Sequence, residues 1–217
     1  MLDFLKASII CGLLTVYVLL VKKNAMRSFS DYILSFFILF QIWTVAIYIL
    51  IFTGNIIEVP YFYRTAAPIT FLIPPLGYFY VRSMLFNEHK FNKIDLLHLL
   101  PFLFFSINYL PFYVSPNSVK IQLISKIVSD KNFSIQQQQG LFSENLFFLF
   151  RPFQAIIYLI FQWGLIHQFK QENANQKIAE QIKLVINWLK IFTSANTCIL
   201  FALISSIGLY FFSENLF

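Results

Sequence analysis

Residues 73–102 read Ile-Pro-Pro-Leu-Gly-Tyr-Phe-Tyr-Val-Arg-Ser-Met-Leu-Phe-Asn-Glu-His-Lys-Phe-Asn-Lys-Ile-Asp-Leu-Leu-His-Leu-Leu-Pro-Phe, and this stretch decides the fold. It joins two apolar runs through a short link that carries Arg82, Lys90 and Lys93. A charged link between apolar runs of bilayer length is typical of a helix-loop-helix at a membrane face. The rest of the chain repeats this order, so the sequence predicts an all-α, polytopic membrane helix bundle.

Composition excludes a soluble protein. Hydrophobic residues make up 58% of the chain, charged residues only 12%, and the mean hydropathy is +0.68, whereas soluble domains carry roughly 25% charged residues. The 28 Phe and 11 Tyr favour strands as well as helices. The apolar runs are continuous rather than alternating, and this excludes the pattern of a membrane β-barrel.

Six apolar runs are interpreted as membrane spans, and the second, Tyr32–Phe52, is long enough as a helix to cross a membrane core about 30 Å thick. Three short links, residues 22–31, 82–93 and 168–183, are expected on one side, and a polar loop, 115–144, on the other. That loop is either an ordered cap or a mobile segment, and residues 119–128 have a weak amphipathic pattern. The runs are Phe4–Val21, Tyr32–Phe52, Thr65–Val81, Ile94–Val114, Leu146–His167 and Leu184–Phe212.

The basic residues predict the orientation. With the amino end outside, the inner side holds ten basic residues and the outer side six. Inner excess of Lys and Arg is the rule for inner-membrane proteins, so a multi-pass protein of the bacterial cytoplasmic membrane is predicted, with its amino end outside. The inner residues are Lys22, Lys23, Arg27, Arg82, Lys90, Lys93, Lys170, Lys177, Lys183 and Lys190, and the outer ones are Lys6, Arg64, Lys120, Lys126, Lys131 and Arg151.

Three prolines interrupt the third run. Pro68, Pro74 and Pro75 each lack a backbone donor, and a membrane tolerates such breaks only where neighbouring groups satisfy the freed carbonyls. The third helix is therefore expected to be bent and packed inside the bundle. The break is either a hinge or ligand crevice, or a static kink that shapes packing.

Motifs for catalysis, cofactors and metals are absent from the sequence, so we expect no enzyme activity and no cofactor. Asp95 and His98 lie at i, i+3 and are expected to share a helix face, as an anchoring pair or a proton relay. Arg151 lies about one turn inside the fifth run, where it either reaches the head groups or binds an anionic ligand at the outer face.

Two short motifs resemble the membrane portion of the AraC-type helix-turn-helix regulators common in Bacteroidetes. They are Pro-Pro-Leu-Gly-Tyr-Phe-Tyr-Val-Arg-Ser at 74–83 and Asp-Leu-Leu-His-Leu-Leu-Pro-Phe at 95–102, and Trp-Leu-Lys at 188–190 resembles the opening of that family's sixth helix. The family has Gly where Pro74 stands and Leu where Gly77 stands, so a backbone contact there is expected to differ. The resemblance implies a seventh span and a cytoplasmic DNA-binding domain, neither of which lies in residues 1–217.

The sequence thus supports two hypotheses. In the first, the chain is the membrane sensor of a one-component transcription regulator, with an unknown small-molecule or peptide ligand, a possible homodimer and DNA contact only through the missing domain. In the second, it is a small membrane carrier or accessory subunit that binds a lipid or apolar ligand between helices. The candidate hinge and coupling residues are Pro74, Pro75, Gly77, Arg82, Asp95, His98 and Pro101, with Arg151 as a candidate ligand contact.

Overall fold

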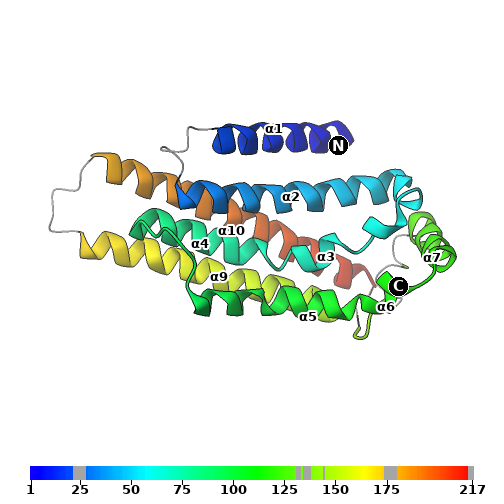
Figure 1. Ribbon diagram of the computed structural model, residues 1–217. Coiled ribbons are helices and arrows are strands. Elements are labelled where there is room, and N and C mark those ends of the chain that lie inside the picture. The colour runs from blue at the N-terminus through cyan, green and yellow to red at the C-terminus, as the bar shows by residue number, and fades with distance from the viewer. Residues whose placement is uncertain (22–27, 131–132, 134–137, 144, 174–179, 215–217) are drawn as a thin grey trace.

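The computed structural model describes residues 1–21, 28–130, 133, 138–143, 145–173 and 180–214 (Figure 1). Part of the predicted orientation rests on residues outside these ranges, namely Lys22, Lys23, Arg27, Lys131 and Lys177. The elements are α1 Leu2–Val21, α2 Phe29–Thr53, η2 Asn55–Ile57, η3 Pro60–Phe62, α3 Ala66–Ile69, α4 Ile73–Phe86, η4 Lys93–Leu99, α5 Leu100–Asn108, α6 Leu110–Val114, α7 Asn117–Ser129, α9 Asn145–Glu172 and α10 Glu180–Glu214, where η marks a 3-10 helix.

Four of these helices are long and apolar enough to cross a membrane, and this confirms a helical chain with membrane-length helices. They are α1, α2, α9 from Leu149 and α10 as far as Leu209. A fifth candidate is the pair formed by Pro60–Ile69 and α4, which is bent by 46°. Much of the apolar surface is exposed, including Phe4 at 77% and Phe201 at 73%. Lipid would cover such side chains in a membrane.

The fourth apolar run does not form the single helix that its length predicts. Residues 94–114 are divided among η4, α5 and α6. Pro101 lies in the first turn of α5 and Pro111 in the first turn of α6. A proline fits the first turn of a helix because that N–H needs no partner there, so each proline begins a new helix instead of continuing the previous one. The six-span count stays a prediction.

The third run is bent at its prolines, as the sequence predicts. Helix α3 ends at Ile69, and α4 begins at Ile73 with prolines in its first turn. Pro75 has no N–H for the carbonyl of Phe71, four residues before it. Gln154 of α9 satisfies that oxygen, because its Nε2 donates a hydrogen bond of 3.1 Å to the Phe71 carbonyl. A neighbouring helix thus supplies the donor that the proline removes.

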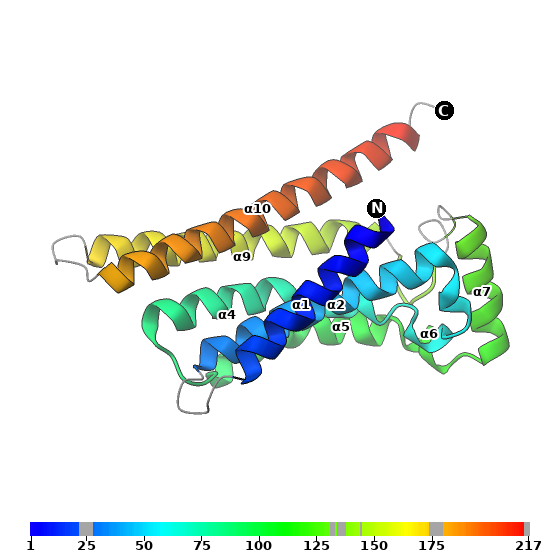
Figure 2. The ribbon, with the colours of Figure 1, turned by 90° about the horizontal axis from the view of Figure 1, so that it is seen from above.

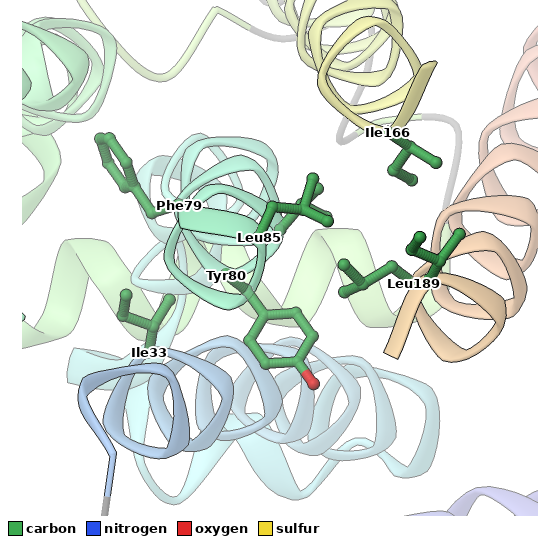
Figure 3. Close-up of a cluster of buried hydrophobic side chains, with 8 residues drawn as sticks. Ile33, Phe79, Tyr80, Leu85, Ile166 and Leu189 are labelled. Atoms are coloured by element: carbon green, nitrogen blue, oxygen red, sulfur yellow. The ribbon is translucent and has the colours of Figure 1, made fainter. Parts of the chain in front are cut away.

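Helix α4 lies at the centre of the bundle, between α2, α9 and α10 (Figure 3). Its Phe79, Tyr80, Val81 and Leu85 are all less than 9% exposed and belong to the main apolar core. Tyr80 also accepts a 2.7 Å hydrogen bond from the indole N–H of Trp188 on α10. The partners from the other helices in this core are Ile33 of α2, Ile166 of α9, and Ile186 and Leu189 of α10.

Part of the polar 115–144 loop forms an ordered cap. Helix α7 buries Ile124 and Ile127 against Ile56 of η2, Tyr63 and Phe112 of α6. The buried face also holds Lys120, whereas Val119 is exposed. The Lys120 ammonium donates a 2.8 Å hydrogen bond to the carbonyl of Tyr113 and lies 4.7 Å from the ring centre of Tyr61. These contacts compensate for burying its charge.

The Gln154 bridge predicts a specific double-mutant result. Gln154→Leu should destabilise the protein by about 1 to 3 kcal/mol, because it leaves the Phe71 carbonyl without a donor. The same change made together with Pro75→Ala should cost much less, since residue 75 then has an N–H of its own. Unfolding in detergent, followed by circular dichroism, measures the four free energies. If Gln154→Leu lowers the free energy of unfolding equally in the wild type and in Pro75→Ala, the hydrogen bond from Gln154 to the Phe71 carbonyl does not compensate for the proline.

Candidate ligand cavity and charged link

A cavity of about 110 Å³ lies beside the bend between α3 and α4. Four helices contribute to its wall, and it is partly open to the surface of the bundle. Figure 2 shows α10 running away from α9 toward its C-terminal end, where the α10 residues of this wall begin. The lining residues are Gln41 of α2; Thr70, Ile73, Pro74 and Gly77 at the bend and in α4; Arg151, Ala155, Leu159 and Gln162 of α9; and Asn196, Ile199, Leu200 and Leu203 of α10.

Gly77 allows α4 and α9 to approach each other at this wall. A Cβ on residue 77 would lie 3.2 Å from Nε2 of Gln162 and 3.5 Å from the ring of Phe37. A side chain at residue 77 would therefore crowd the Gln162 amide, which would have to move by a few tenths of an ångström. The glycine thus sets where the Gln162 amide sits relative to the cavity.

One polar group in the cavity wall is buried without a hydrogen-bond partner among the described residues. It is Oε1 of Gln162, a residue that is only 2% exposed. Oε1 of Gln154 on α9 and the hydroxyl of Thr193 on α10 also have no partner there, but they do not line the cavity. Buried polar atoms normally find a partner, and each exception needs a physical explanation.

Arg151 lines this cavity instead of extending outward to the lipid head groups. It is half-buried, and among the described residues neither a hydrogen bond nor an ion pair reaches it. The wall holds no acidic residue among those that line it. Of the two alternatives for Arg151, the geometry therefore favours contact with an anion from outside the chain.

At its other end, α4 carries a network of charges at the link to η4. Arg82 donates two parallel hydrogen bonds to Asp95, of 2.9 and 2.7 Å, and a third of 2.7 Å from Nε to Glu88. Both members of the Arg82–Asp95 pair are nearly buried, with side-chain exposures of 13% and 7%. Paired N–H···O bonds between a guanidinium and a carboxylate fix distance and orientation together. The pair therefore holds the start of η4 against the end of α4.

The backbone reinforces this position of Asp95. Asn92 precedes η4 and forms a capping box with Asp95, in which the Asn92 N–H donates a 2.8 Å hydrogen bond to the carboxylate. The Asp95 carboxylate is thus satisfied by donors from two elements, the Arg82 guanidinium and the Asn92 N–H.

The predicted pairing of Asp95 with His98 is not what the structure has. Nδ1 of His98 is hydrogen-bonded to the hydroxyl of Tyr158 on α9, and its ring packs against Phe79. Asp95 bonds to Arg82 instead, because the turn after α4 brings the start of η4 back beside the end of α4. The two residues anchor η4 to different helices.

The remaining candidate residues fall in different places. Pro74 and Gly77 join Arg151 at the cavity, whereas Pro75 lines a second, apolar space of about 240 Å³ between α2, α4 and η4. Pro101 begins α5 and lines neither space. No sequence motif pointed to the cavity residues Gln41, Gln162 and Asn196. Their signal is positional, since Arg151, Ala155, Leu159 and Gln162 recur at the helical period.

Within the described residues, no group of three or more His, Cys, Asp or Glu side chains is placed to hold a metal ion. Cys11 and Cys198 are exposed rather than buried. A scan against protein-family models, a search of curated proteins and a search of solved structures each find no match.

The charged link predicts a stability difference between two carboxylates. Asp95→Asn should cost about 3 kcal/mol, because it leaves a nearly buried guanidinium with less of its compensating charge. Glu88→Gln should cost less than about 1 kcal/mol, since Glu88 is more exposed and makes a single bond to Arg82. Thermal unfolding of the purified variants in detergent measures both. A similar loss of stability in the two variants would mean that Asp95 stabilises the link no more than Glu88 does.

Proposed function

We propose that this chain is the membrane-embedded sensor part of a one-component transcription regulator of the AraC type. The observation that carries the proposal is that one central helix, α4, lines a polar cavity at its start and carries the Arg82–Asp95 pair near its end. The motifs at 74–83 and 95–102, which suggest this family, cover these same two places. DNA would be contacted through a domain that lies beyond residues 1–217.

Helix α4 is suited to transmit an event in the cavity. Pro74 and Arg82 are eight residues apart, which is about 12 Å along a helix. The helix between them is packed by large side chains such as Phe79 and Tyr80, so a shift at one end moves the other end with it. A ligand that fits one position of α4 better than another would shift the population of positions, and η4 would follow through Asp95.

We further propose six crossings of the bacterial inner membrane, with the amino end outside. In Figure 1 the C-terminal ends of α1, α4 and α9 and the N-terminal ends of α2 and α10 lie at one end of the bundle. Helix α7 lies at the opposite end, and α5 runs lengthwise between the two. This arrangement supports counting residues 94–114 as a crossing, although three elements share them.

A carrier or accessory subunit is the second candidate. The apolar space beside Pro75, lined by Phe36, Phe40, Leu76 and Phe79 among others, favours it, because such a space suits a lipid chain held between helices. A carrier would move its ligand across the bilayer of a proteoliposome without any partner. A sensor would bind the ligand and leave its distribution between the two leaflets unchanged.

Transcription is the readout that tests the sensor. In the bacterium that carries the gene, a chromosomal Asp95→Asn change should alter the mRNA of a defined set of genes by at least about threefold, since it releases η4 from α4 while Glu88 still binds Arg82. Asp3→Asn, an exposed carboxylate far from the link, is the matched control. RNA sequencing measures both strains at equal protein level. Identical transcriptomes in the Asp95→Asn and control strains would count against the regulator.

Cysteine labelling tests the topology. In a background with Cys11 and Cys198 replaced by Ser, a cysteine introduced at exposed Ser118 of α7 should react with a membrane-impermeant maleimide in intact cells. A cysteine at Lys90, exposed in the link after α4, should react only after the membrane is permeabilised. Labelling of both positions in intact cells would mean that residues 94–114 do not cross.

A further inference from the structure

We propose that the Arg151 cavity binds the acidic head of an amphiphile, a carboxylate or a phosphate, whose acyl chain leaves the cavity along α10. This inference rests on the sensor function, because it names the ligand class of the same cavity. Two features of the wall lead to it: the charge of Arg151, and the small size of the cavity with its apolar side along α10.

The charge of the wall requires an anion. Arg151 is the one charged side chain among the lining residues, and no described residue pairs with it. An arginine between membrane-length helices is costly unless a counter-charge reaches it. The guanidinium presents N–H groups in a planar fork that matches the two oxygens of a carboxylate or phosphate. A neutral ligand would leave this cost in place.

The Gln162 amide lines a separate part of the cavity. Gln162 is nearly fully buried and has no partner for its Oε1. That oxygen is an acceptor, so an anion does not satisfy it. Arg151 and Gln162 are eleven residues apart on α9, which is about 16 Å along the helix. The acidic head is therefore bound at Arg151.

The size of the cavity excludes a whole lipid. A volume of 110 Å³ has room for several water-sized groups but not for an acyl chain. Beyond the polar end, the wall consists of Ile199, Leu200 and Leu203 on α10, the helix that runs away from α9 in Figure 2. An acyl chain can follow these residues to the lipid side of the bundle. The ligand is therefore an amphiphile rather than a free inorganic anion.

The test measures binding of radiolabelled oleate to the purified full chain in a neutral detergent. Oleate should bind saturably, and unlabelled oleate should displace it, whereas oleyl alcohol, with the same chain and no charge, should compete at least about tenfold more weakly. Dioleoyl phosphatidate is compared with dioleoyl phosphatidylcholine as a competitor. Strong competition by phosphatidate identifies a membrane lipid as the source of the head, and weak competition identifies a free fatty acid; both support the proposal.

Variants connect the binding to this cavity. Arg151→Gln should weaken oleate binding by about tenfold or more, and Arg151→Lys, which keeps the charge, should lose less. Lys170→Gln, an exposed cation on the same helix and outside the cavity, should bind as the wild type does. Equal binding by Arg151→Gln would overturn the proposal. Oleyl alcohol that competes with oleate for the wild-type protein as strongly as unlabelled oleate does would also overturn the proposal. This measurement does not depend on whether any variant folds.

The outcomes separate this proposal from the function on which it rests. If the Asp95→Asn change alters transcription but oleate binding does not depend on charge, the sensor stands and its ligand belongs to another class. If oleate binding depends on Arg151 but Asp95→Asn leaves every transcript unchanged, the cavity is assigned correctly and the protein is a carrier or accessory subunit.

Discussion

The carbonyl of Phe71 is the constraint on which the arrangement of the bundle depends. Pro75 removes the N–H that would bond to it, and in a membrane an unsatisfied carbonyl costs several kcal/mol. Gln154 of α9 supplies the missing donor, so α9 has to pack against the bend at the position of Gln154. One amide therefore fixes the position of a long helix relative to a broken one. The prolines are tolerated because α9 is there.

The cavity follows from the same bend. Because α3 and α4 meet at 46°, the side chains of Thr70, Ile73 and Pro74 cannot fill the angle between them, and α9 and α10 line the space that remains. A static kink would be expected to close such a space with apolar side chains. Instead, Arg151 and Gln162 face it from α9. The combination of a bend with a costly polar wall is more consistent with a ligand site than with packing alone.

Features that depend on local sequence were predictable, and those that depend on neighbours were not. Continuous apolar runs predicted α1, α2, α9 and α10, and three prolines predicted the bend. The division of residues 94–114 was missed because Pro101 and Pro111 were counted within an apolar run rather than as helix starts. The partner of Asp95 was missed because Arg82 is thirteen residues away and only the turn after α4 brings the two together.

The two ends of α4 differ in how they hold their neighbours. Near its end, Arg82 is fixed by three hydrogen bonds and Tyr80 by the indole of Trp188. At its start, Pro74 borders a cavity. In the proposed sensor, a ligand in this cavity would act on the start of the helix. Because a packed helix moves as a unit, the displacement would reach the place where Asp95 attaches η4.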